Sequence, residues 1–288
     1  MDSSALTRAV RIGFVCSLVL LPALLVAFAA HGSAGTVSHA LHLLFAASVA
    51  VELMALVVVV VVCRAHEPGE PIRRTWILLA ACLAVRLLAE LRLGTLYLGW
   101  GPEGGSGLYV FYVIGLRYLY TASDLLFAAG LVSAMLSYRA TGLPFGATWR
   151  EGVYLAGILA LPVLAFLLSP TMNAWFLPEA GDQVKIFRFT QVCVGSAVAC
   201  LCVVLRRFAL QMGAGALGRV WTAVWIGGLA HVASFLVFAL MEAVWPESAE
   251  LFEQYALWIY AGCWLVASAQ QREIALLARR PQEEAEKE

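Results

Sequence analysis

The sequence predicts an all-α fold, a polytopic bundle of about eight transmembrane helices. Of the 288 residues, 62% are hydrophobic and only 13% are charged, and the mean hydropathy is +0.84. A soluble domain is closer to half apolar and a quarter charged. Long uncharged apolar runs recur along the chain, and basic residues fall between alternate runs. Apolar runs of this length are typical of membrane-spanning helices.

Eight segments are long enough to cross a bilayer. A helix rises 1.5 Å per residue, so about 20 residues cross a hydrocarbon core about 30 Å thick. We expect the second, fourth and seventh segments to tilt or to extend past the membrane, because they are longer than this. Residues 1–270 then form a single transmembrane domain. The segments lie at about 11–30, 37–63, 75–98, 108–136, 152–169, 187–205, 220–244 and 252–270.

The first segment resembles a secretory signal sequence. Residues 1–35 combine Arg8 and Arg11 with an apolar run and a following Ala-Phe-Ala-Ala stretch. Cleavage there would leave seven helices and place the new N-terminus outside. Because the apolar run is longer than a usual signal core, we expect it to be retained as the first helix.

Basic residues determine the predicted orientation. If the N-terminus is cytoplasmic, the outer segments hold only two basic residues, Lys185 and Arg188. Cytoplasmic loops carry the excess of Lys and Arg in membrane proteins. We therefore predict an integral protein of the plasma or inner membrane with both termini in the cytoplasm. The cytoplasmic segments hold fourteen basic residues: Arg8, Arg11, Arg64, Arg73, Arg74, Arg139, Arg150, Arg206, Arg207, Arg219, Arg272, Arg279, Arg280 and Lys287.

The inner surface carries two further predictions. Trp76, Trp149 and Trp221 fall near the cytoplasmic ends of their segments, where amphipathic rings favour the membrane interface. Residues 271–288 are predicted to extend the last helix as far as Pro281 and then to continue as an acidic run. We expect this cytoplasmic tail to be partly disordered.

Ionisable residues inside the apolar segments are the informative ones. Each costs a few kcal/mol or more at the middle of a bilayer unless it is paired, so we expect these side chains to face the bundle interior. Gly227 and Gly228, one turn from a buried histidine, allow close helix approach or a local kink. The buried ionisable residues are Glu52, Arg86, Glu90, Arg92, Arg117, Asp124 and His231.

Depth below the outer surface predicts two ion pairs between the third and fourth segments. By residue count, Glu90 lies roughly 12 Å deep and Arg117 roughly 13 Å. Arg86 lies roughly 18 Å deep and Asp124 roughly 24 Å. We therefore predict that Glu90 pairs with Arg117 and that Arg86 pairs with Asp124.

The same count predicts one polar layer near the middle of the bundle. Glu52 and His231 lie roughly 21–22 Å deep, between Arg86 and Asp124. Two interpretations stay open. The charges hold the helices in register, or Glu52, Arg86, Asp124 and His231 form a ligand-binding or proton-responsive site.

The sequence provides no catalytic, metal or cofactor residues that we would assign. Bis-histidine haem needs two histidines at one depth, whereas His42 lies roughly 8 Å from the outer surface, well short of His231. Retinal needs a lysine within a helix, and Lys185 and Lys287 both lie outside the middle of a segment. The phosphate-loop, HExxH and GxSxG motifs are absent, and a net charge of zero argues against nucleic acid as a partner.

Three functional classes remain open. We favour a ligand-sensing or scaffold module without catalysis, which binds a small or lipidic ligand, or a protein partner through cytoplasmic loops. The first alternative is a proton-coupled transporter of a small solute or lipid. The second alternative is an intramembrane enzyme that modifies lipids. The lipid bilayer is the partner common to all three.

Overall fold

The described part of the chain is almost entirely helical. The computed structural model describes residues 3–31, 34–103, 106–139, 152–160, 181–211, 215–245 and 248–285. Of these residues 93% are helical and none is in a strand, which confirms the all-α prediction. Besides a helical segment at 152–160, the helices are α1 (Ser3–His31), α2 (Ala34–Ala65), α3 (Pro71–Tyr97), α4 (Gly107–Arg139), α7 (Gly181–Gln211), α8 (Ala216–Val244) and α9 (Ala249–Ala285).

Each predicted segment coincides with a helix. The fifth segment is helical at 152–160, and its remainder lies outside the described residues. Two stretches in the described chain are long and apolar enough to cross a membrane, Val37–Ala65 in α2 and Gly107–Arg139 in α4.

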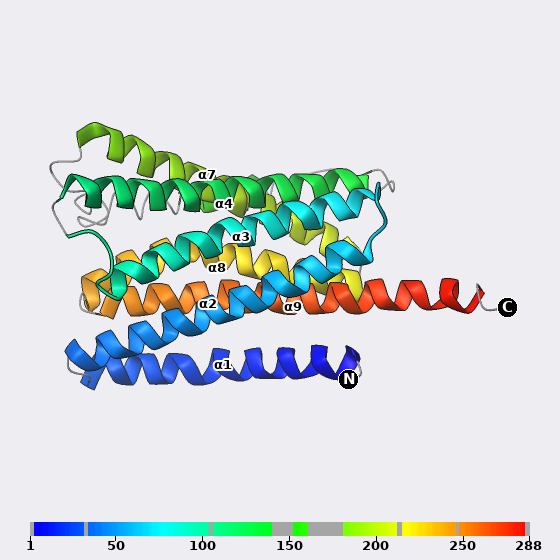
Figure 1. Ribbon diagram of the computed structural model, residues 1–288, viewed down its shortest axis with the longest axis horizontal. Coiled ribbons are helices and arrows are strands. Elements are labelled where there is room, and N and C mark those ends of the chain that lie inside the picture. Colours follow the sequence, from blue (N-terminus) through cyan, green and yellow to red (C-terminus); the bar gives the residue numbers. More distant parts are fainter. Residues whose placement is uncertain are drawn as a thin grey trace.

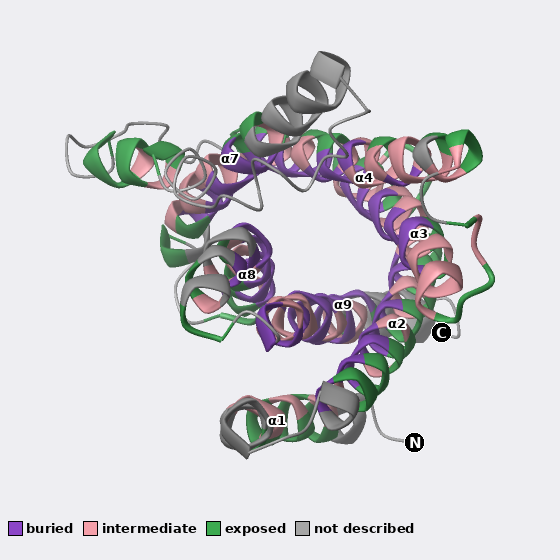
Figure 2. Cartoon of the chain, turned by 90° about the vertical axis from the view of Figure 1, so that its left-hand side faces the viewer, coloured by how far each residue is buried: buried purple, intermediate pink, exposed green. Residues whose placement is uncertain are grey.

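Six helices form a closed ring. Figure 2 looks along the bundle and shows α2, α3, α4, α7, α8 and α9 arranged around a common centre, with their buried faces turned inward. Each helix packs against the next, and α9 closes the ring by packing against α2. Helix α1 lies outside the ring and packs mainly against α9.

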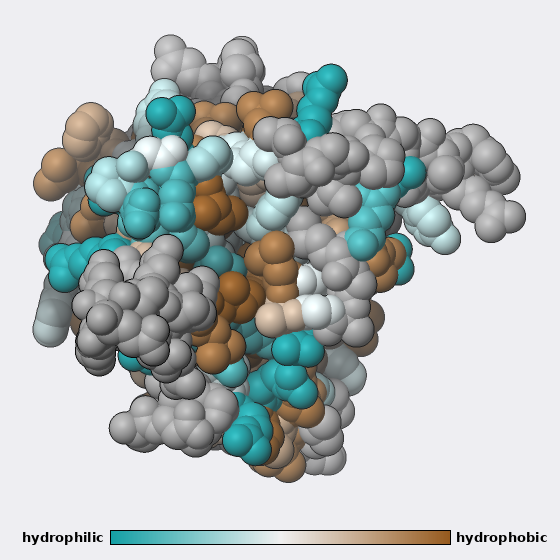
Figure 3. Space-filling model, turned by 90° about the vertical axis from the view of Figure 1, so that its right-hand side faces the viewer, coloured by the Kyte–Doolittle hydropathy of each residue, from teal (hydrophilic) through white to brown (hydrophobic). Residues whose placement is uncertain are grey.

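The helices run along the long axis, so the molecule has two distinct ends. In Figure 1, α1 begins and α9 finishes at the right, where the turn between α2 and α3 also lies. We call this the terminal end, and the opposite one the distal end. The turn between α3 and α4 lies at the distal end. Figure 3 looks onto the terminal end and shows hydrophilic side chains gathered there around apolar ones.

Helix α9 is the longest described helix and extends past the rest of the bundle at the terminal end (Figure 1). It continues through Pro281 to Ala285, so the prediction that the helix ends at Pro281 was wrong. A proline removes one backbone hydrogen bond and crowds the preceding turn. This cost bends or weakens a long helix without always ending it, and Pro22 likewise lies inside α1.

Glycines allow the close contacts of α8. A Cβ atom at Gly228 would overlap the sulfur of Cys202 on α7, and one at Gly227 would lie 2.9 Å from Cβ of Cys263 on α9. Small residues let helix backbones approach in this way. The close approach predicted for Gly227 and Gly228 is therefore found, and it seats α8 between α7 and α9.

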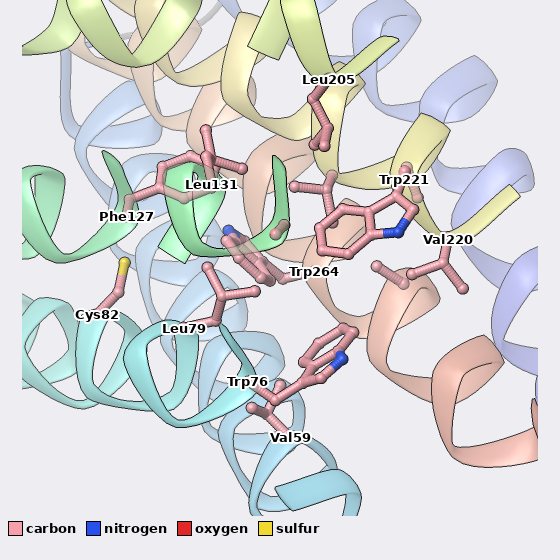
Figure 4. Close-up of a cluster of buried hydrophobic side chains, with 14 of the residues drawn as sticks. Val59, Trp76, Leu79, Cys82, Phe127, Leu131, Leu205, Val220, Trp221 and Trp264 are labelled. Atoms are coloured by element: carbon pink, nitrogen blue, oxygen red, sulfur yellow. The ribbon is translucent and has the colours of Figure 1, made fainter. Parts of the chain in front are cut away.

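An aromatic cluster fills the ring on the terminal-end side (Figure 4). Trp76 and Trp221 stack with ring centroids 6.1 Å apart, and the indole N–H of Trp221 donates to the hydroxyl of Tyr138 at 2.7 Å. Phe127 and Trp264 pack with centroids 5.1 Å apart. We use the name aromatic cluster for these five residues.

The aromatic cluster contains Trp76 and Trp221, which were predicted to lie near the cytoplasmic membrane interface, and holds both inside the ring. Both side chains are fully buried, at 0% exposure, and Trp149 lies outside the described residues. The distance of a residue along its helix predicts how close it lies to the membrane interface. Whether its side chain is buried depends on how the helix is rotated about its own axis. Both tryptophans point into the ring.

Candidate functional site

The ring encloses a polar network at the distal side of the aromatic cluster. It consists of Glu52 on α2, Arg86 and Glu90 on α3, Asp124 on α4, and His231 on α8. All five are buried. The structure thus brings together Glu52, Arg86, Asp124 and His231, which the sequence predicted to share a layer.

Arg86 is the centre of the network. Its Nε donates to Oε1 of Glu52 at 3.2 Å, and its Nη2 donates to Oε1 of Glu90 at 3.4 Å. Its Nη1 lies 3.4 Å from Nδ1 of His231. A single guanidinium fork therefore connects three helices, which suits arginine because its donors point in fixed directions.

The contact with Arg86 fixes the tautomer of His231. Arginine has donors only, so Nδ1 of His231 must accept the hydrogen bond. The ring proton of neutral His231 then sits on Nε2, which lies 2.9 Å from Oδ1 of Asp124 and donates to it. His231 thereby links the Arg86 side of the network to Asp124.

Two tyrosine rings cover the guanidinium of Arg86. Its central carbon lies 4.6 Å from the ring centroid of Tyr260 on α9 and 5.5 Å from that of Tyr120 on α4. The face of an aromatic ring attracts a cation, more strongly where water is excluded. The ring of Tyr260 also lies 5.2 Å from that of His231, centroid to centroid.

The two predicted interhelical ion pairs do not form. Glu90 pairs with Arg86 of its own helix, one turn away, and not with Arg117. Arg86 reaches Asp124 only through His231. Residue counting gives depth but not the rotation of a helix about its axis, and rotation decides which side chains meet.

The network has an excess of negative charge. Glu52, Glu90 and Asp124 are three carboxylates; Arg86 contacts the first two directly, and Asp124 contacts His231. With neutral His231 and all acids ionised, the network carries a formal excess of two negative charges. Buried like charges are costly, so such groups share protons.

Two carboxylate oxygens of the network have unused acceptor capacity. Oε2 of Glu52 and Oδ2 of Asp124 are buried and have no hydrogen-bond partner. Buried polar atoms nearly always have partners, and a carboxylate oxygen of this kind can accept a further donor or carry a proton. Glu52 is bonded to Arg86 and Asp124 to His231, so the two carboxylates are at opposite ends of the Arg86–His231 contact.

Sequence reasoning missed two participants. Glu90 belongs to the network and not to a separate pair, and its spacing of four residues from Arg86 on one helix was the available signal. Tyr260 was not assigned any role, although it is a polar aromatic residue in the middle of an apolar run. No comparable signal identified its partner, because α9 is distant from α3 in the sequence.

The described residues contain no group of three or more His, Cys, Asp or Glu side chains placed to hold a metal ion. Comparisons with protein-family models, curated proteins and solved structures find no match to the chain.

Proposed function

We propose that the protein is a polytopic membrane protein of about eight spans, with both termini cytoplasmic, that acts as a proton-responsive sensory module without catalysis. The buried network of Glu52, Arg86, Glu90, Asp124 and His231 is the proton-binding site. Helix α9 carries its state to the cytoplasm.

The two ends of the bundle support the membrane placement. Basic residues on the described helices gather toward the terminal end, as in Arg64 at the last turn of α2 and Arg139 at the last turn of α4. Large apolar side chains such as Leu43, Val57 and Leu88 are exposed along the sides. In water such a surface would aggregate, whereas in a bilayer lipid chains cover it.

The excess of buried carboxylates is the single observation that supports proton binding best. Two protons shared among three acids would neutralise the network, and the two acceptor oxygens without partners provide places for them. Protonation of Glu52 alters a hydrogen bond between α2 and α3, and protonation of Asp124 alters one between α4 and α8. The network therefore couples proton binding to the packing of α2, α3, α4 and α8.

Helix α9 provides a route from the network to the outside of the bundle. Tyr260 covers the Arg86 guanidinium in the ring interior. From there α9 runs without a break to the terminal end and beyond it (Figure 1). If Arg86 shifts, its contact with Tyr260 changes. This change would move α9 as a rigid helix, including the part of α9 that extends into the cytoplasm.

Infrared difference spectroscopy in lipid nanodiscs tests the proton site. We expect a protonated carboxylic acid band that loses intensity as pH rises, because the protons shared among the acids are then released. Asp124→Asn and Glu52→Gln should each reduce the band. Glu67→Gln, at an exposed acid between α2 and α3, is the matched control and should leave it unchanged. The proposal fails if the wild-type protein shows no such band.

Proton flux into sealed vesicles separates this proposal from a proton-coupled transporter. The aromatic cluster closes the ring interior on the terminal-end side of the network. We therefore expect proton binding without net flux across the vesicle membrane. A flux that disappears in Asp124→Asn would favour the transporter instead.

A further inference from the structure

A groove lies outside the ring, between α1, α2 and α9. Its volume is about 380 Å³, within the usual range for small-ligand sites. Val57, Leu53 and Met54 of α2 form one wall and are about half exposed. Val10 of α1 and Leu265 of α9 contribute further apolar surface. The groove therefore suits a hydrocarbon chain.

The groove is closed toward the distal end by the way α1 attaches to α9. Phe14 of α1 lies directly over Gly262 of α9, where any side chain would overlap the ring. Farther along, Trp258 Nε1 donates to Oγ of Ser17 at 3.1 Å, and the hydroxyl of Tyr255 donates to the carbonyl of Leu18 at 3.1 Å. The two helices are antiparallel and stay in contact there.

Opposite charges stand where the groove approaches the terminal end. Arg272 and Glu273 of α9 line it, opposite Thr7 of α1. Arg272 is two turns beyond Leu265 along α9, or about 10 Å toward the terminal end. A ligand that fits the groove must therefore have an apolar chain. It must also have a negative and a positive group at about this distance from the part of the chain that contacts Leu265.

The geometry points to a specific binding site for a zwitterionic phospholipid with a primary ammonium group, such as a phosphatidylethanolamine. One acyl chain lies along Val57 and Leu265, the phosphate binds Arg272, and the ammonium binds Glu273. This inference rests on the proposed membrane placement. An anionic headgroup would instead meet Glu273 with repulsion, which makes the site selective among lipids.

Native mass spectrometry of protein extracted from vesicles with equal amounts of phosphatidylethanolamine and phosphatidylglycerol tests the site. We expect one phosphatidylethanolamine per chain to be retained. Arg272→Gln should lower its retention about tenfold, because a charge-assisted contact is lost. Glu273→Gln should abolish the preference over phosphatidylglycerol while still retaining a lipid.

Two matched controls keep the test specific. Arg74→Gln removes an exposed basic residue from α3 and should not change retention. Val57→Trp fills the groove and should displace the lipid, whereas Val60→Trp, on α2 outside the groove lining, should not. Thermal melts confirm that each variant is folded.

The outcomes distinguish this site from the proton site. Equal retention in wild type and Arg272→Gln, or a wild-type preference for phosphatidylglycerol, would overturn the lipid site. Val57→Trp should keep the infrared response to pH, so loss of the groove leaves the proton proposal intact. Failure of the protein to float with vesicles would instead contradict the membrane placement itself.

Discussion

The polar network and the aromatic cluster occupy the same ring, yet they hold it together by different physics. Trp76, Trp221 and Trp264 are as deeply buried as Arg86. The aromatic cluster stabilises the fold through close packing and dispersion, so its contribution to the free energy of unfolding grows with the volume that its side chains fill. The network stabilises the fold only where its buried charges are paired. The ring thus pairs a region that tolerates conservative substitution with one that does not.

The largest expected effect is removal of the central cation. Arg86→Ala leaves Glu52 and Glu90 buried without their guanidinium, and we expect it to lower the free energy of unfolding by about 3–5 kcal/mol. Denaturation in detergent micelles measures this loss. Arg74→Ala, at an exposed position on α3, is the control and should cost little. A similar small loss for both variants would show that the network does not stabilise the ring.

A double-mutant cycle sharpens the same comparison. If Arg86 stabilises the fold by compensating Glu52, then Arg86→Ala should cost less in a Glu52→Gln background than in wild type. The pair Trp76→Ala and Arg86→Ala provides the control cycle, because the two side chains belong to different regions. Strict additivity for Arg86 and Glu52 would refute their coupling.

The second effect is loss of volume from the aromatic cluster. Trp221→Ala should cost about 3 kcal/mol, because it leaves a cavity where α8 meets α3 and α4 and removes the hydrogen bond to the hydroxyl of Tyr138. Trp100→Ala is matched to it, since Trp100 is 78% exposed and should cost almost nothing. The same denaturation assay compares them, and equal losses would contradict the packing role.

A smaller effect is expected where α8 meets α7. Gly228→Ala should cost about 2 kcal/mol, because the added methyl group overlaps the sulfur of Cys202. Gly13→Ala on α1 meets no neighbouring atom within 4 Å, so it should be neutral or stabilising. Thermal unfolding of the two variants checks the difference in sign.

The smallest effect concerns the hydrogen bond between Trp221 and Tyr138. Tyr138→Phe keeps the ring but removes the oxygen that accepts from Trp221, so we expect a loss of about 1 kcal/mol. Indole fluorescence should also report the lost hydrogen bond. An unchanged stability would mean that the aromatic cluster depends on packing alone.

The sequence alone determined the helices and the position of their buried groups along the bundle. Each apolar run is long enough for a helix, and a fixed rise of 1.5 Å per residue converts residue count into distance along the helix axis. For this reason Glu52, Arg86, Asp124 and His231 could be predicted to share a layer. The exception was the end of α9, because Pro281 weakens a helix without stopping it.

Only the tertiary structure decided which groups meet. The rotation and neighbours of each helix depend on contacts between distant segments, which a residue count does not contain. Rotation paired Glu90 with Arg86 instead of Arg117, and it turned Trp76 into the ring. Ring closure brought Tyr260 onto Arg86 from the far end of the sequence. The position of a residue along its helix follows from the local sequence, whereas its side-chain contacts depend on how all the helices pack together.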